Sequence, residues 1–111
     1  MSRSYLARLL YINLNYTVFD GKLPECEIQV DKELMQLAEK FIGYKCMGVY
    51  SSGTIYINPN IPKWQDEYVL LHEMIHMWQD IHGYKLNHGK RLKKFAKKAC
   101  KQLQIDIQYV L

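Results

Sequence analysis

The chain has 111 residues, of which 49% are hydrophobic and 23% charged, and its formal net charge is +4. These values are typical of one soluble globular domain, and no segment has the apolar length of a membrane span or a signal peptide. Three widely spaced cysteines without a CxxC pair favour free thiols in a reducing cytoplasm over a disulfide framework. We therefore expect a single domain over residues 1–111 that is monomeric, cytoplasmic and without a membrane partner.

The first part of the chain is predicted to form one helix followed by a turn. Leucines at helical spacing predict a helix over residues 4–16, with Ser2 or Ser4 as its N-cap. Residues 20–24, Asp-Gly-Lys-Leu-Pro, have the composition of a turn. The chain is therefore expected to reverse direction before the next element.

Three short strands and a second helix are expected next. Residues 26–30 alternate between apolar and polar side chains as a strand does, and a helix capped by Asp31 follows to about residue 41. Residues 45–50 and 54–58 are predicted to pair as a hairpin through a Ser-Ser-Gly turn. These segments indicate a small antiparallel sheet.

A long helix is predicted after Pro62. No Gly or Pro interrupts residues 63–82, and two acidic residues fall in the first turn, where carboxylates complement the helix dipole. Leu71, Ile75 and Trp78 recur at helical spacing and form an apolar stripe that would bury the helix. Polar side chains can then occupy a separate face.

His72-Glu73-Met74-Ile75-His76 on this helix has the pattern HExxH. Two histidines four residues apart project from one face and can bind one Zn²⁺, while the Glu stays free as a general base. Zinc would lower the pKa of a bound water so that it ionises near neutral pH, and the resulting hydroxide could attack a peptide carbonyl. Because this short pattern also occurs by chance in unrelated helices, the flanking helix signals are what favour a metal site.

A catalytic zinc usually takes three protein ligands, so a third must follow His76. His82 is six residues further on, but in a continuous helix it would lie about 9 Å along the axis and on another face. His88 follows a turn that begins at Gly83, so the chain can reverse and present it. We favour His88, with His82, Asp106 or the absence of a metal as the alternatives.

The last predicted helix, from about residue 88 to 103, is strongly basic. Residues 1–84 hold seven Lys and Arg against ten Asp and Glu, a balance of −3, whereas residues 85–111 hold eight against one, a balance of +7. Apolar residues bury one side of this helix, and the remainder is either a surface for a nucleic-acid backbone or a solvated face. The candidate nucleic-acid-binding residues are Lys90, Arg91, Lys93, Lys94, Lys97, Lys98 and Lys101. The tail, residues 105–110, is expected to be an edge strand or a packed terminus.

Three other side chains are candidates for supporting roles at a metal site. Asp80 could accept a hydrogen bond from a ligand imidazole, although an ordinary surface carboxylate is the simpler interpretation. Tyr84 or Tyr44 could stabilise an oxyanion, and the sequence does not distinguish them.

Three stretches of the chain resemble the SprT-like metalloprotease domain, the family that includes Spartan. The first runs from Asn15 through the turn Phe19-Asp20-Gly21-Lys22-Leu23-Pro24, and the second is Gly53-Thr54-Ile55-Tyr56-Ile57-Asn58. The third is Leu70-Leu71-His72-Glu73-Met74-Ile75-His76, followed by His88-Gly89 and then Phe95. The cysteines are too few for the C-terminal zinc ribbon of many members, so we expect a minimal form.

The resemblance implies a zincin-like α+β fold with an N-terminal helix, a hairpin-containing sheet, the HExxH helix and the basic helix. It also implies His72, His76 and His88 as ligands of one Zn²⁺ per chain, with Glu73 as the catalytic base. Family members act on proteins crosslinked to DNA or associated with it. We therefore predict a zinc-dependent endopeptidase with a protein substrate and DNA as a further partner. The alternative is a non-catalytic zinc-containing module that binds nucleic acid or a protein through the basic helix 88–103.

Overall fold

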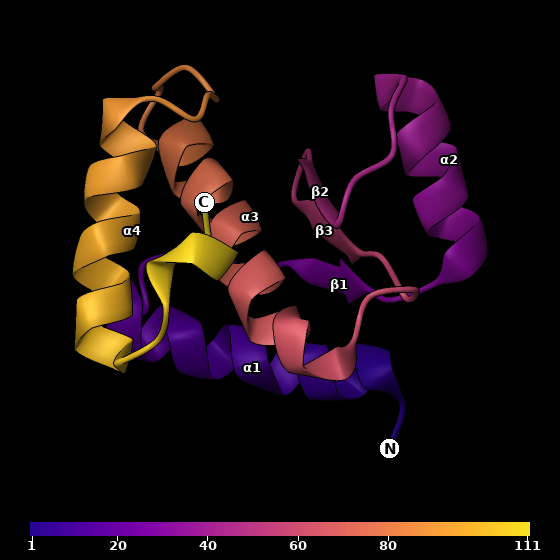
Figure 1. Ribbon diagram of the computed structural model, residues 1–111, viewed down its shortest axis with the longest axis horizontal. Coiled ribbons are helices and arrows are strands. Elements are labelled where there is room, and N and C mark those ends of the chain that lie inside the picture. Colours follow the sequence, from indigo (N-terminus) through magenta and orange to yellow (C-terminus); the bar gives the residue numbers. More distant parts are fainter.

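In the computed structural model, which describes residues 1–111, four α-helices pack with a three-stranded sheet (Figure 1). The predicted α+β class is therefore confirmed. The helices are α1 (Arg3–Val18), α2 (Lys32–Ile42), α3 (Asp66–Ile81) and α4 (Lys90–Leu103). The strands are β1 (Glu27–Gln29), β2 (Gly48–Ser51) and β3 (Thr54–Ile57), and short 3₁₀ helices lie at Lys63–Gln65 and Ile107–Tyr109.

Side-chain caps begin the first two helices. The Ser2 hydroxyl accepts a hydrogen bond from the Tyr5 amide at 3.1 Å, and the Asp31 carboxylate accepts one from the Leu34 amide at 2.9 Å. Gly43 ends α2 in the left-handed conformation, with φ at 90°, which a residue without Cβ adopts easily. Both predicted helices are confirmed, with their ends within two residues of the predicted positions.

The sheet is mixed, so the prediction of an antiparallel sheet is wrong for one strand. Its order is β1-β3-β2, with Ile28 of β1 beside Ile55 of β3 in a parallel pair and Tyr50 of β2 opposite Ile55 in an antiparallel pair. The hairpin is confirmed. Parallel pairing requires a long crossover, which the segment containing α2 and β2 supplies between β1 and β3. Alternation along a strand indicates which side is buried but not the direction of its neighbour.

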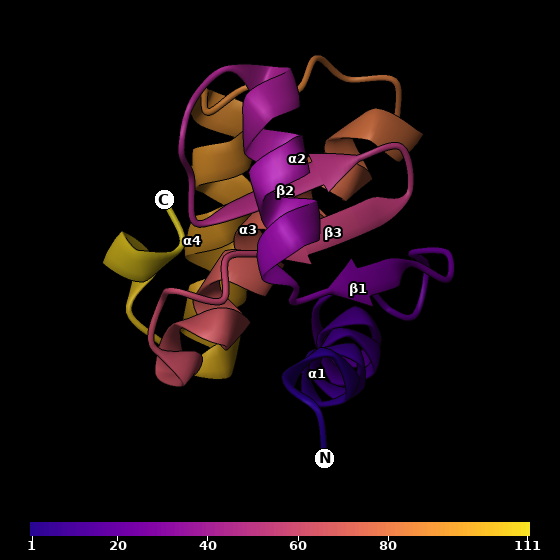
Figure 2. The ribbon, with the colours of Figure 1, turned by 90° about the vertical axis from the view of Figure 1, so that its right-hand side faces the viewer.

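Helix α3 lies at the centre of the core. Its residues Leu70, Leu71, Met74 and Ile75 are each 0% exposed, because neighbours enclose most of its circumference. Helix α1 packs against both α3 and β1, and α4 packs against α3 on the side away from the sheet, while α2 covers the opposite face of the sheet (Figure 2). The tail after α4 buries Val110 in the same core and is a packed terminus rather than a strand. None of the four helices has the length and apolar character that crossing a membrane requires.

Arg3 fixes the start of α3 against the N-terminus of the chain. Its guanidinium donates two hydrogen bonds to the Asp66 carboxylate, at 2.9 and 2.6 Å. It also donates to the backbone carbonyls of Pro59 and Ile61, at 2.8 and 2.9 Å. A bidentate Arg–carboxylate pair restricts the orientation of both groups. The first turn of the helix that carries HExxH is therefore held in one position.

Candidate metal centre

Strand β2 approaches α3 closely at Gly48. A Cβ at this position would stand 2.5 Å from Cγ1 of Val69 and 3.3 Å from Cγ of Glu73, so a side chain cannot be accommodated without a shift. The missing side chain allows β2 to lie directly over the HExxH turn. Glu73 is consequently only 6% exposed, enclosed by α3 and β2.

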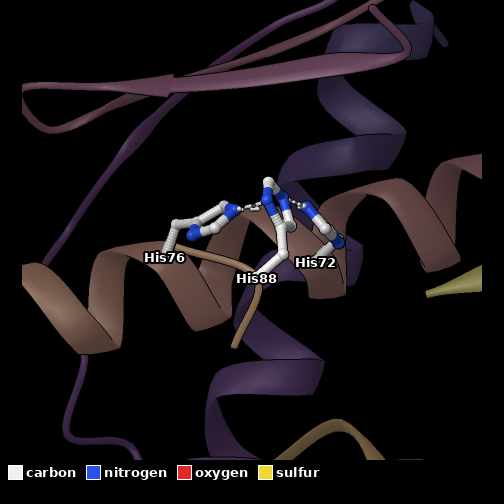
Figure 3. Close-up of side chains that lie close together, drawn as sticks. All are labelled: His72, His76 and His88. Carbon is white, nitrogen blue, oxygen red and sulfur yellow. Dashed lines mark hydrogen bonds between the residues drawn. The ribbon is translucent and has the colours of Figure 1, made fainter. Parts of the chain in front are cut away.

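Three imidazoles converge beside this contact (Figure 3). His72 and His76 project from adjacent turns of α3, and His88 enters from the loop that precedes α4. The Nε2 atom of His72 lies 3.1 Å from that of His76 and 3.1 Å from that of His88, and the remaining pair is 3.2 Å apart. The structure therefore brings together all three histidines that the sequence favoured as ligands.

The chain reverses after α3 and so presents His88. Gly83 adopts a positive φ of 72°, and the Tyr84 amide donates to the Gln79 carbonyl at 2.8 Å. The side-chain amide of Gln79 donates to the Asn87 carbonyl at 3.2 Å, which fastens the loop to α3 just before His88. The turn predicted from Gly83 is confirmed, and its course is set by a fully buried glutamine.

Hydrogen bonds at the second ring nitrogen orient two of the imidazoles. His76 Nδ1–H donates to Gln79 Oε1 at 2.8 Å, and His72 Nδ1–H donates to the backbone carbonyl of Val110. With the proton on Nδ1, Nε2 keeps its lone pair and points it toward the other rings. Such acceptors on the far nitrogen are typical of metal-ligating histidines.

Burial sets the charge of the cluster. It lowers the pKa of His72 to about 4 and also lowers the pKa of His76, so both rings are neutral near pH 7, as metal ligands must be. Burial raises the pKa of Glu73 to about 8, because no cationic side chain lies against its carboxylate. Glu73 Oε2 is 4.0 Å from His72 Nε2, so the carboxylate lies beside the point where the imidazoles converge. It is not one of the converging ligand atoms.

The donor set fits a zinc ion. Tetrahedral Zn²⁺ with imidazole ligands at about 2.0–2.1 Å places neighbouring nitrogens about 3.3 Å apart, close to the spacing of the three Nε2 atoms. Lone pairs at this distance repel each other unless a cation lies between them. Three imidazole ligands also leave a fourth position for water or substrate, as in catalytic rather than structural zinc sites.

A comparison with protein-family models matches residues 7–109 to the SprT-like family. The chain belongs to the SprT-like family. The match spans nearly the whole chain and includes all three converging histidines, so the predicted family is confirmed. No curated protein and no solved structure matched. The zincin-like part of the predicted SprT-like fold therefore stays a prediction.

The alternative ligands lie away from the imidazole cluster of this SprT-like chain. His82 is exposed, and its Nδ1–H donates to the Trp78 carbonyl at 2.8 Å, one turn back along α3. Asp106 accepts a hydrogen bond from the Gln108 amide at 3.1 Å and caps the last 3₁₀ helix. Neither side chain is among the three whose ligand atoms converge.

The three candidates for supporting roles lie in different surroundings. Asp80 accepts a hydrogen bond from the Tyr50 hydroxyl at 2.6 Å, so it orients a tyrosine rather than a ligand imidazole. Tyr44 lines the cleft beside the metal centre, whereas Tyr84 stacks under the Arg91 guanidinium at 3.7 Å and does not line it. The imidazole acceptors are Gln79 and the Val110 carbonyl. The Gln79 acceptor could have been predicted, because Gln79 follows His76 by one helical turn. No local sequence pattern indicates that the Val110 carbonyl accepts a hydrogen bond from His72.

Gln79→Ala is expected to weaken zinc binding by about 10- to 100-fold, because His76 Nδ1 and the Asn87 carbonyl both lose their partner. A competition titration against a chromogenic chelator measures this change. Gln36→Ala, an exposed glutamine on α2, is the matched control. Lower thermal stability of the metal-free Gln79→Ala protein with unchanged zinc affinity would show that Gln79 only packs the turn.

All seven candidate basic residues of this SprT-like chain lie exposed on or at the start of α4. The opposite side of the helix packs into the core through Leu92, Ala96 and Ala99. No ion pair in the structure involves any of the seven, so their charges are uncompensated by the rest of the chain.

Proposed function

We propose that this chain is a zinc-dependent endopeptidase. The observation that carries the proposal is the convergence of three imidazole Nε2 atoms within 3.2 Å of one another, with the free carboxylate of Glu73 alongside. A purely structural zinc site has no use for this carboxylate, and membership of the SprT-like family is in keeping with peptidase chemistry.

His72, His76 and His88 would hold the ion. When bound, Zn²⁺ supplies a Lewis acid that polarises a carbonyl and makes water more acidic. Glu73 would accept the proton of the attacking water and later deliver it to the leaving amine. Its enclosure between α3 and β2 raises the basicity of the carboxylate and keeps it free of competing hydrogen-bond donors on other side chains.

Strand β2 would align the substrate. It is an edge strand of the sheet, and its residues Gly48, Val49 and Tyr50 line the cleft beside the imidazoles. An edge strand offers unpaired backbone groups to which an extended peptide can add as a further strand. This mode of binding would present a peptide bond to Glu73 without requiring a particular side-chain sequence.

Zinc removal tests the proposal. Cleavage of a fluorogenic peptide pool is expected to disappear after dialysis against a chelator and to return with about one zinc per chain. The fold should persist through this cycle, which circular dichroism can verify. Unchanged cleavage by fully zinc-depleted protein would exclude the proposed metallopeptidase chemistry.

Proteins crosslinked to DNA or associated with it are the proposed substrates. This finer assignment is supported by the family and by the basic surface on α4, whose charges lack partners within the chain. Cleavage of one protein in free and DNA-crosslinked form, by the same zinc-loaded sample, measures the preference. Equal cleavage rates for the two forms would show that the peptidase does not select DNA-crosslinked substrates.

Docking on nucleic acid through α4 is also the basis of the second candidate function, a non-catalytic zinc-containing module. The observation that favours this second function is the row of exposed Lys and Arg side chains without ion-pair partners along one side of the helix. A non-catalytic module would bind zinc and DNA but leave every peptide intact. The DNA contact and the peptide chemistry can thus be tested separately.

Replacing Lys93, Lys94, Lys97 and Lys98 by Gln is expected to weaken DNA binding and to make it less dependent on salt, by about one unit of logarithmic slope per lost phosphate contact. Fluorescence anisotropy with a labelled duplex at several salt concentrations gives both quantities. The matched control replaces four exposed lysines outside α4 by Gln, namely Lys22, Lys32, Lys40 and Lys45. Equal losses in the two quadruple variants would show that net charge, rather than the α4 surface, determines binding.

A further inference from the structure

The cleft beside the metal centre is predominantly apolar. It encloses about 430 Å³, and eleven of the sixteen residues that line it are hydrophobic. The other five are Gly48, the three imidazoles and Glu73. Apart from the groups that would hold zinc or move a proton, the lining therefore contributes no acidic or basic side chain that could pair with a charged substrate residue.

Two separate parts of the chain supply this apolar surface. One wall comes from the end of α2 and the segment leading into β2, including Ile42 and Met47, and the other from Leu86 and the tail around Val110. In the view of Figure 1, α2 and the C-terminus lie apart, with the strands of the sheet between them. A substrate segment that crosses the metal centre would contact both.

The rims of the walls expose apolar area to water. Met47 is 46% exposed and Leu86 is 45% exposed, although both are large hydrophobic residues. A substrate side chain that covers them removes apolar surface from water on both sides, which favours binding. A charged substrate side chain in the same place would lose its hydration without gaining a partner.

We propose that this cleft selects an apolar substrate side chain next to the cleaved bond, with Met47 and Leu86 as specificity-determining residues. The proposal rests on the peptidase function proposed above and names the kind of sequence that the site accepts. Edge-strand pairing would hold the substrate backbone, and the cleft would distinguish its side chains. Segments rich in Leu, Met or Phe are the expected sites of cleavage.

Peptide binding to the zinc-loaded Glu73→Gln protein tests selectivity without cleavage. A set of fluorescent peptides identical except for Leu, Ala, Lys or Glu at one central position is titrated by anisotropy. The Leu peptide is expected to bind at least about 10-fold more tightly than the Lys and Glu peptides, as hydrophobic pockets discriminate by at least this factor. Equal affinities across the set would overturn the proposal.

A charge placed in the cleft should change the preference. In the Glu73→Gln background, Met47→Glu is expected to abolish the advantage of the Leu peptide and to favour the Lys peptide. Met47→Leu, a swap of similar volume, should keep the original order. Ile12→Glu is the matched control, because Ile12 is a similarly exposed apolar residue on α1 that does not line the cleft. A Met47→Glu protein that binds zinc normally but retains the Leu preference would overturn the assignment of Met47.

Mass-spectrometric mapping of cleavage sites separates this proposal from the peptidase function. Wild-type protein is incubated with a denatured polypeptide, and the residues flanking each cut are compared with the composition of the polypeptide. Cuts without apolar enrichment would overturn the selectivity and keep the peptidase function. Failure of wild-type protein to cut, with the Leu peptide still preferred in binding, would overturn the peptidase function and support a selective apolar cleft.

Discussion

Glu73→Gln is expected to reduce peptide cleavage by zinc-loaded protein about 10²- to 10⁴-fold, the usual contribution of general acid–base catalysis. The amide has nearly the shape of the carboxylate but cannot take a proton from water. Because the Glu73 carboxylate is not one of the three converging ligand atoms, zinc content should stay the same. Cleavage rates and elemental analysis on the same samples measure both effects.

Glu67→Gln is the matched control for this change. Glu67 lies in the first turn of the same helix, does not line the cleft, and is not among the converging ligand atoms. Its loss should leave cleavage close to the wild-type rate. If the Glu73→Gln protein cleaved as fast as wild type, Glu73 would not be the base. If wild type and both variants bound zinc and cleaved nothing, the non-catalytic module would be the better description.

His88→Ala is expected to reduce bound zinc from about one per chain to near zero, whereas His82→Ala should retain it. The first change removes one of three converging imidazoles, and the second removes a side chain that only bonds to the Trp78 carbonyl. Two ligands on α3 alone, His72 and His76, form a much weaker site. Elemental analysis of both variants beside wild type, after reconstitution and desalting, gives the comparison.

The two histidine variants also distinguish the geometries considered from the sequence. Loss of zinc only in His82→Ala would indicate an extended HExxH site that continues along α3. Retention in both would indicate that another group, such as Asp106, completes the site. A wild-type protein without zinc after reconstitution would remove the basis for the proposed hydrolysis.

Features that depend on short stretches of sequence were predictable. Asp31 caps α2 because its carboxylate reaches an amide three residues away, and the residue type and position are visible in the sequence. The four-residue spacing of His72 and His76 likewise predicts that both side chains lie on the same face of a helix, one turn apart. The position of His88 near the other two histidines was also predictable from a local signal, because Gly83 after α3 allows the chain to reverse direction.

Features that depend on distant contacts were not predictable. The parallel partner of β1 is separated from it by α2 and β2, and alternation along β1 is the same for either direction. The close approach at Gly48 depends on Val69 and Glu73 across the interface, so the glycine alone does not reveal it. The carbonyl that orients His72 belongs to Val110, 38 residues away.

The contact between His72 and Val110 has a consequence for how this site can vary. The acceptor is a backbone carbonyl, which every residue type possesses, so replacing the side chain at position 110 does not remove it. The side chain itself is 1% exposed in the core and holds the tail in place. What the imidazole requires is the path and length of the segment after α4. Insertions or deletions there would disturb the metal centre more than most exchanges of one apolar residue for another.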